Sequence, residues 1–282
     1  MTNKFNAFAS FIAIVVLLGA CTWRGPNPPP ATLDAPMGPF TTTSSVVTTS
    51  PGFGDGTMYY PDTEPGPFGV VAVAPGWLAS QNSLDTLGNR IASHGFVVIT
   101  IDVNRPRSDG PQSRADQLLA ALDQVANEAA VAGIADNTRQ AVMGHSMGGG
   151  GALYASIDRP ALKASIPLAP WARGADFSAV TVPTMIIGCE DDTVAPVGSH
   201  AIAFYDAIAN TVPKAYAEIA DASHSCVNDF NTDPLETAEV ASSAVSFLKR
   251  FVDNDSRYTP FLCPIPELDP PLSDRRATCP YN

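Results

Sequence analysis

Two kinds of hydrophobic pattern alternate along most of this chain. Val70–Ala74 and Phe96–Ile101 are continuous apolar runs, which is typical of strands buried on both faces of a parallel sheet. Residues 83–93 and 114–132 instead carry apolar side chains at helical spacing, which predicts helices with one face against a core. This alternation predicts an α/β fold, in which helices flank a mostly parallel central sheet.

The other predicted elements continue the same alternation. The β-branched stretch at residues 41–49 and the segment G-T-M-Y-Y-P are expected to form a hairpin at the start. Residues 215–220, A-Y-A-E-I-A, are expected to be the last strand of the sheet. Further strands are predicted at residues 141–143, 164–169 and 184–192, and further helices from Met147, around 198–209 and over 236–252.

Length and composition favour one catalytic domain and exclude some kinds of partner. With 282 residues, of which 45% are hydrophobic, the chain can bury a large core without a second domain. Its formal net charge of −12 would repel phosphate backbones, so nucleic acid is not an expected partner. Neither metal-ligand spacing of Cys and His nor a phosphate-binding Gly-rich loop is found, so no metal and no cofactor are expected.

The first twenty residues are interpreted as a signal peptide. Lys4 provides a positive start, and Phe5–Ala20 is apolar but short for a membrane span. The stretch ends in L-L-G-A-C, which resembles a bacterial lipoprotein box with Cys21 as the acylated residue. The alternative is ordinary cleavage that leaves Cys21 unmodified, but Leu18 is bulky where that kind of site needs a small residue.

The number of cysteines supports the same interpretation. The chain has five cysteines, and in an exported protein four of them can pair while one needs another explanation. Lipid attachment to Cys21 would provide that explanation. The Pro-rich tail from Thr259 to Asn282 is expected to be loose unless Cys263 and Cys279 staple it.

Residues 144–148, G-H-S-M-G, provide the clearest chemical signal. They fit the G-x-S-x-G pattern of a nucleophile elbow, and they lie between a predicted strand and a predicted helix, as that motif requires. Glycines suit the tight turn, and the helix N-terminus directs free N–H groups at a developing oxyanion. We therefore expect Ser146 to be a catalytic nucleophile. The alternative is a purely structural Gly-rich turn.

Four histidines compete for the role of catalytic base. In this fold the catalytic residues follow the order Ser, then Asp or Glu, then His. His94 and His145 precede Ser146, and His200 is expected to be a packing residue in a helix. His224 lies in a loop after the predicted last strand, where the base belongs. His224 is therefore our candidate.

The acid is expected at the carboxyl end of the strand that precedes the base. Glu190, Asp191 and Asp192 all lie there, and composition does not separate them. Only one carboxylate needs to face His224, where it would orient the ring and stabilise the imidazolium. The other two are expected to be solvated loop charges.

Several motifs taken together resemble the bacterial cutinase and polyester-hydrolase family, which includes the poly(ethylene terephthalate) hydrolases. The resemblance extends from Arg24 to the C-terminus. It implies that Asp192 is the acid, and that the backbone N–H groups of Met147 and Trp77 form the oxyanion hole. The motifs that carry it are G-H-S-M-G-G-G-G, A-S-H-G-F-V-V-I-T-I-D, D-T-V-A-P-V, S-H-S-C and D-N-D-S-R-Y.

The same resemblance implies an open, lidless substrate cleft with aromatic walls. Trp77 would line one wall, where the family more often has Tyr or Phe, and Trp171 would line the other. Such a pair can hold an aryl or acyl group by stacking. The alternative for either Trp is packing in the core. Val194 is expected to complete the cleft floor, and His145 is grouped with these substrate-binding residues.

The resemblance also implies roles for residues behind the cleft. His200 and Phe204, four residues apart and so on one helix face, are expected to hold Trp171 in place. A disulfide between Cys189 and Cys226 is implied, which would tie the acid loop to the base loop.

Other features of the resemblance concern metal and substrate preference. Some relatives have a calcium site nearby, but Ala220 stands where they carry a carboxylate, so no calcium is expected. The chain departs from the family at residues 85–89 and in the loop from Asn104. Both departures concern substrate preference rather than the chemistry.

These expectations describe a secreted serine carboxylic-ester hydrolase. Residues 24–282 would form its single catalytic domain, which is expected to be a monomer that meets a membrane only through the lipid anchor. Its substrates would be cutin-like or poly(ethylene terephthalate)-like polyesters and esters of short to medium acyl chains. The alternatives are a triacylglycerol lipase, a small-ester esterase and a non-catalytic surface protein with the same fold.

Overall fold

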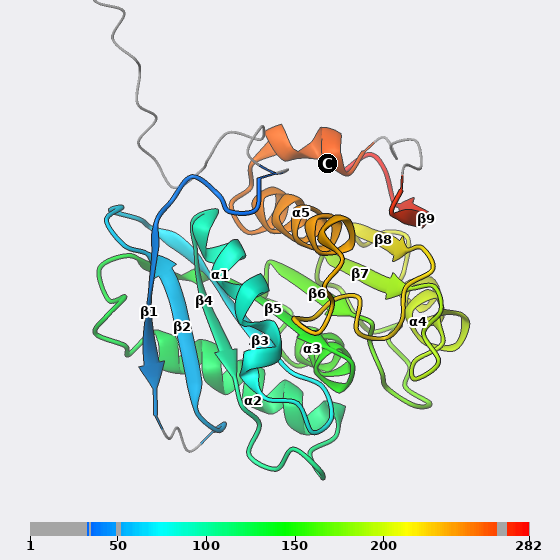
Figure 1. The fold of residues 1–282 in the computed structure, drawn as a ribbon, viewed down its shortest axis with the longest axis horizontal. Helices are drawn as coiled ribbons and strands as arrows, with labels where there is room; N and C mark the ends of the chain where they lie inside the picture. The colour runs from blue at the N-terminus through cyan, green and yellow to red at the C-terminus, as the bar shows by residue number, and fades with distance from the viewer. Residues whose placement is uncertain (1–32, 34, 49–51, 264–269, 282) are drawn as a thin grey trace, which may run out of the picture.

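The computed structural model describes residues 33, 35–48, 52–263 and 270–281. The expected signal peptide at residues 1–20 and Cys21 lie outside these residues. One sheet organises the described chain, with strand order β1-β2-β4-β3-β5-β6-β7-β8-β9 (Figure 1). The strands are β1 (Thr42–Val47), β2 (Gly56–Pro61), β3 (Phe68–Ala74), β4 (Phe96–Ile101), β5 (Ala135–His145), β6 (Ala164–Leu168), β7 (Thr184–Cys189), β8 (Lys214–Ile219) and β9 (Leu272–Ala277).

The centre of the sheet is parallel and its edges are antiparallel. β4, β3, β5, β6, β7 and β8 run parallel to one another, whereas the hairpin β1–β2 is antiparallel and joins β4 in the antiparallel sense. The predicted α/β fold with a mostly parallel sheet is therefore confirmed. Because the carboxyl ends of parallel strands meet at one edge, the loops after β3, β5, β7 and β8 lie close together.

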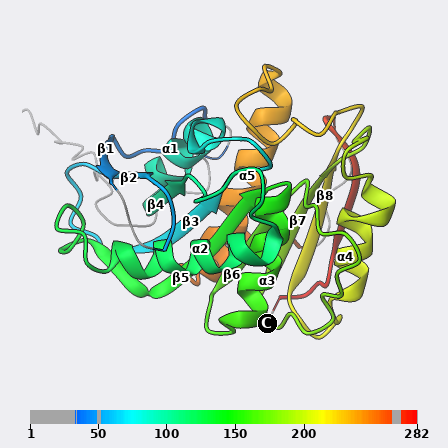
Figure 2. The same cartoon turned by 90° about the horizontal axis from the view of Figure 1, so that it is seen from below.

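Helices cover both faces of this sheet. α1 and α5 lie on one face, and α2, α3 and α4 lie on the other (Figure 2). Within the described residues, no helix is long and apolar enough to cross a membrane. The helices are α1 (Asp85–Ser93), α2 (Pro111–Val125), α3 (Met147–Asp158), α4 (Ala201–Ala207) and α5 (Pro234–Phe251).

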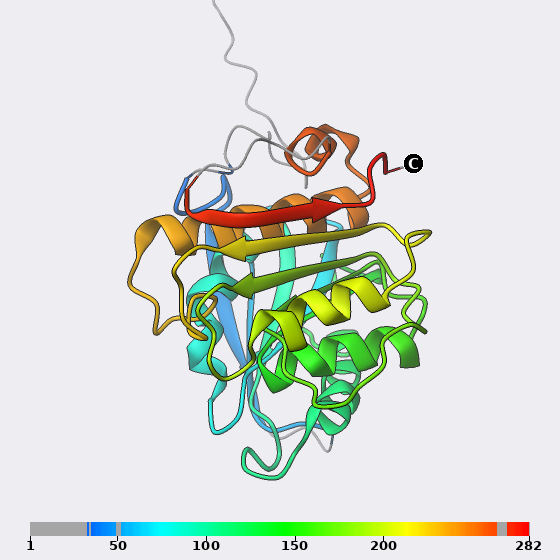
Figure 3. The same ribbon diagram turned by 90° about the vertical axis from the view of Figure 1, so that its right-hand side faces the viewer.

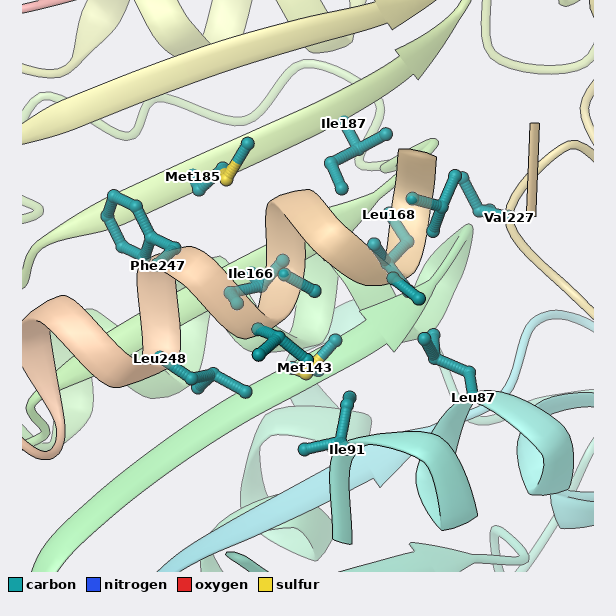
Figure 4. Packing of buried hydrophobic residues seen from close by; sticks show 14 of the residues in the cluster. Leu87, Ile91, Met143, Ile166, Leu168, Met185, Ile187, Val227, Phe247 and Leu248 are labelled. Carbon is teal, nitrogen blue, oxygen red and sulfur yellow. The ribbon is translucent and has the colours of Figure 1, made fainter. Parts of the chain in front are cut away.

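The continuous apolar runs arise because each strand of the parallel centre meets a core on both faces. In β3, Val71 and Val73 pack with the residues of α1 and α5, while Val70 and Ala72 pack with those of α2. Successive side chains of a strand point to opposite faces, so a strand covered on both faces is expected to be mainly apolar. Figure 4 shows the first of these cores, where Leu87, Ile91, Phe247 and Leu248 of the helices meet Met143, Ile166, Leu168, Met185 and Ile187 of the strands.

The prediction that residues 215–220 form the last strand was wrong. β9 follows it in the C-terminal tail and pairs antiparallel with β8, for example Ala217 with Arg275 (Figure 3). A disulfide also joins Cys263 to Cys279 across this tail. The segment L-S-D-R-R-A has no apolar alternation, because its side chains are only half-buried at the edge of the sheet. Backbone pairing, which the sequence pattern does not display, makes it a strand.

Several predicted boundaries also change. The strand expected at 184–192 ends at Cys189, so the three candidate acids lie in the loop after it. The helix expected over 114–132 begins at Pro111, a residue suited to the first helical turn, and ends at Val125. The helix expected around 198–209 spans only Ala201–Ala207, and His200 lies just before it with non-helical backbone angles. The strand expected at 141–143 extends over the whole of β5.

Candidate active site

Ser146 lies on a strained turn between β5 and α3. Its backbone has φ 56° and ψ −117°, a conformation that a residue with a side chain rarely adopts and that costs about 1–3 kcal/mol. The turn is held by two hydrogen bonds, from the N–H of Ser146 to the carbonyl of Leu168 and from the N–H of Gly150 to the carbonyl of Ser146. The structure therefore places the residue on a turn with the geometry of a nucleophile elbow.

The elbow packs directly on the end of β3. A Cβ at Gly148 would lie 2.2 Å from the backbone oxygen of Ala74, and a Cβ at Gly76 would lie 3.1 Å from the Cβ of Ser146. Glycine at both positions lets the turn after β3 approach the nucleophile. The first N–H groups of α3 begin here at Met147, and N–H groups of a first helical turn have no partner within the helix.

The partly exposed His224 and the buried Asp192 form a hydrogen-bonded pair. His224 Nδ1 lies 2.6 Å from Asp192 Oδ2, and because a carboxylate only accepts, Nδ1 carries the proton. Asp192 Oδ1 accepts from the backbone N–H groups of Val194 and Ala195 at 2.8 and 2.7 Å. Burial raises the pKa of Asp192, but these hydrogen bonds outweigh it and the pKa is lowered. The carboxylate therefore stays charged while it orients the ring.

The two neighbouring acids lie outside this contact. Glu190 and Asp191 are exposed whereas Asp192 is 4% exposed. Glu190 accepts from the backbone N–H of Asp221. Of the three carboxylates that the sequence left open, the structure brings only Asp192 to His224.

His145 connects the elbow with the loop of His224. The rings of His145 and His224 lie 4.7 Å apart between centroids, and His145 Nε2 lies 3.0 Å from the backbone oxygen of His224. Since Ser146 directly follows His145, this contact places the loop of His224 beside the elbow at one edge of the sheet. His94, the other histidine that precedes Ser146 in the sequence, is fully buried.

Trp77 projects into solvent from the turn after β3. It is 57% exposed, and its indole N–H donates to the backbone oxygen of Arg107 at 3.2 Å. The next residue, Leu78, has φ 58° and donates its N–H to the backbone oxygen of Pro106. The loop from Asn104 thus fixes both the course of this turn and the direction of the Trp77 ring.

Arg114, which the sequence analysis did not select, binds both the turn after β3 and the loop from Asn104. It is fully buried, and its guanidinium donates to the backbone oxygens of Pro75, Pro106 and Asp109 at 2.9, 3.4 and 3.1 Å. Burial lowers its pKa to about 10, so it stays charged at neutral pH. The sequence did indicate that this residue is buried, because Arg114 lies four residues before Leu118 and therefore on the same face of α2.

Trp171 is fixed beside the nucleophile by its backbone and by stacked rings. Its N–H donates to the carbonyl of Ser146 at 2.8 Å. The ring of His200 stacks on Trp171 at 6.4 Å, Phe204 contacts His200 edge-on at 5.7 Å, and Phe177 contacts Phe204 at 4.9 Å. A cavity of 460 Å³ opens beside this stack, lined by Trp171, Arg173, Gly174, Ser199 and His200. Neither Trp77 nor Trp171 is therefore a core residue.

A disulfide joins Cys189 to Cys226 next to the site. Cys189 ends β7 just before the acid loop, and Cys226 lies two residues after His224, so the bridge joins the two loops. Among the described residues, no cluster of His, Cys, Asp and Glu is arranged to hold a metal ion.

Reduction of the two disulfides is expected to lower the melting temperature. They close loops of 37 and 16 residues, and loop-closure entropy gives about 3–4 kcal/mol for each bridge. Differential scanning calorimetry with and without dithiothreitol measures the change. The double variant Cys263→Ser/Cys279→Ser serves as a control that isolates the bridge at the site. Equal melting temperatures under both conditions would contradict the prediction.

A nucleophile elbow and a hydrogen-bonded Asp–His pair at the carboxyl edge of a parallel sheet define the α/β-hydrolase class. Comparison with known proteins is more specific. The PET hydrolase-like family model, PETase, matches residues 20–280. The chain belongs to this family and is a serine carboxylic-ester hydrolase.

Characterised relatives cover almost the whole chain. A bis(hydroxyethyl) terephthalate hydrolase of Streptomyces coelicolor is 43% identical over 99% of this chain and 93% of its own length. Cutinase 1 of Thermobifida cellulosilytica is 48% identical over 92% of this chain and 98% of its own. A cutinase of Thermobifida fusca has the same identity over 92% of this chain and 85% of its own.

Proposed function

We propose that this enzyme hydrolyses polyesters, cutin-like or poly(ethylene terephthalate)-like, together with esters of short to medium acyl chains. The observation that carries the proposal is the exposed aromatic wall at Trp77 next to the nucleophile turn of Ser146. The chain is also similar to proteins named cutinase and bis(hydroxyethyl) terephthalate hydrolase.

In the proposed mechanism, Ser146 Oγ attacks the ester carbonyl carbon while His224 accepts the hydroxyl proton. Asp192 keeps the proton of His224 on Nδ1, so that its other ring nitrogen is free to accept. The tetrahedral oxyanion binds the backbone N–H groups of Met147 and Trp77. His224 then protonates the departing alcohol oxygen, which leaves an acyl ester on Ser146.

Water completes the cycle by the same route. His224 removes a proton from water, the resulting hydroxide adds to the acyl carbon, and the bond to Ser146 Oγ breaks as the serine regains its proton. The products are a carboxylic acid and the free enzyme. No step needs a cofactor.

Substrate recognition is assigned to the exposed side chains around this centre. Trp77 and Val194 are 57% and 56% exposed, and together with Trp171 they offer apolar surface to an aryl or acyl group. His200 and Phe204 would act through Trp171, on which they pack. Exposed apolar side chains of this kind fit a lidless cleft that accepts one segment of a long insoluble chain.

A substrate panel tests the proposal. Purified enzyme is expected to release products from amorphous poly(ethylene terephthalate) film and to hydrolyse p-nitrophenyl butyrate faster than p-nitrophenyl palmitate. Chromatography of the film products and absorbance of p-nitrophenol measure the two rates. Cleavage of soluble esters alone would indicate a small-ester esterase, and a preference for long chains and triacylglycerol would indicate a lipase.

The location of the enzyme in the cell envelope is also part of the proposal. Residues 1–20 would direct export, and Cys21 would carry a lipid that anchors the enzyme at the cell envelope. Residues 24–282 would form one catalytic domain that acts as a monomer without nucleic-acid partners.

A further inference from the structure

His145, the residue before the nucleophile, is fixed on the loop that carries His224. Its Nε2 lies 3.0 Å from the backbone oxygen of His224, across 79 residues of sequence. Only 6% of His145 is exposed. This contact therefore links the loop of His224 directly to the elbow.

Asn228 determines which ring nitrogen of His145 carries the proton. The backbone N–H of Phe230 donates to Asn228 Oδ1 at 2.9 Å, so the amide nitrogen Nδ2 points the other way, 3.4 Å from His145 Nδ1. Nδ2 can only donate, so Nδ1 accepts and carries no proton. The proton of the neutral ring is then on Nε2, which donates it to the carbonyl of His224.

The surroundings of His145 keep the ring in this neutral form. Burial and then the charge of His224 lower the pKa of His145 to about 4. The titratable groups that act on it are His224 and, beyond it, Asp192. A second proton on Nδ1 would face the amide donor of Asn228, which is 5% exposed, and two donors would then oppose each other.

We propose that Asn228 and His145 form a positioning pair for the catalytic base. Asn228 fixes the Nε2–H tautomer of His145, and His145 uses that proton to hold the backbone of His224 beside the elbow. This inference rests on the proposed function, because it takes His224 as the base. Both residues act through His224, and this positioning role of His145 is additional to the substrate contact expected from the sequence.

The Asn228→Asp variant separates this role from the folding of the loop. A carboxylate oxygen still accepts from the N–H of Phe230, so the turn is retained. The oxygen that faces His145, however, accepts instead of donating and requires a proton on Nδ1. Because burial keeps the ring neutral, the single proton should then move to Nδ1 and leave Nε2 without the proton that holds the carbonyl of His224. In spectra of protein labelled with ¹⁵N-histidine at pH 7, wild-type His145 should show a proton on Nε2 alone, and the variant should show a proton on Nδ1 alone.

Kinetics of the same variant test the link to catalysis. The kcat for p-nitrophenyl butyrate should fall about tenfold with KM nearly unchanged, because a displaced base slows the chemistry without weakening substrate binding. A changed tautomer with unchanged kcat would overturn the positioning role.

Asn231→Asp is the matched control. Asn231 lies on the same loop, where its Oδ1 accepts from the N–H of Asp233 and its Nδ2 donates to the carbonyl of Cys226 and to Glu236 Oε2, all at 2.9 Å. Asn231→Asp therefore also replaces a donor on this loop by an acceptor, but away from His145. Asn231→Asp should change neither the His145 tautomer nor kcat. If it lowered kcat as much as Asn228→Asp does, the loss would come from a less stable loop and not from the His145 tautomer. A proton on Nδ1 in the wild type would overturn the proposal without any variant. Because the spectra need no substrate, an inactive wild type that shows the expected tautomer would contradict only the proposed function.

Discussion

Ser146→Ala is expected to lower the kcat for p-nitrophenyl butyrate by about 10⁶-fold, the scale on which hydrolases of this type lose activity without their nucleophile. The variant removes the only oxygen that can form the acyl-enzyme, while the oxyanion donors and the cleft remain. Initial rates at saturating substrate measure the loss. Mass spectrometry after treatment with an organophosphonate should show one adduct on the wild type and none on the variant.

The control for this experiment is Ser178→Ala, which changes an exposed serine in a loop away from the elbow. It should keep full activity and the phosphonate adduct. If Ser146→Ala retained more than a small fraction of the wild-type rate, the nucleophile would be another residue. In that case the strained backbone of Ser146 would have a purely structural origin.

Asp192→Asn is expected to lower kcat by about 10⁴-fold. The amide oxygen can still accept from the N–H groups of Val194 and Ala195, so the loop keeps its shape. The amide nitrogen would then face His224 Nδ1 and favour the tautomer with the proton on Nε2. That nitrogen is the one that must accept the serine proton, so the base would be lost while its position is kept.

Asp191→Asn provides the matched control, because it makes the same chemical change at the exposed neighbour. It should leave kcat within about twofold, as expected for a surface substitution away from the chemistry. Circular dichroism and melting curves of both variants separate a loss of chemistry from a loss of folding. A large effect of Asp191→Asn together with a small effect of Asp192→Asn would reverse the assignment of the acid.

The parallel centre of the fold could be predicted because its residues carry the pattern themselves. Val70–Ala74 is apolar at every position since a helix layer covers each face of β3. The elbow could be predicted because its glycines are demanded by local geometry, as the contact between Gly148 and Ala74 shows. The order of catalytic residues in this fold then led to His224 and to three carboxylates, among which the family resemblance selected Asp192. The structure places His224 and Asp192 in contact, while their catalytic roles stay predictions.

Other features depend on groups that have no signature in the sequence. β9 is a strand because its backbone pairs with β8, and its polar side chains give no period. The amide of Asn228 is oriented by the hydrogen bond that its Oδ1 accepts from the backbone N–H of Phe230. The sequence pattern does not show this bond. The helical pattern places Arg114 on the buried face of α2, but its hydrogen bonds go to backbone oxygens, which the sequence pattern does not identify.

The edge strand β9 also bears on how this protein avoids aggregation. β8 is fully buried and apolar for most of its length, and an uncovered edge of that kind is a template for a strand from another molecule. β9 occupies that edge and presents Asp274, Arg275 and Arg276 in its place. Charged side chains at an outer strand disfavour further strand addition. The C-terminal strand therefore protects the edge of the sheet against pairing with a strand of another molecule.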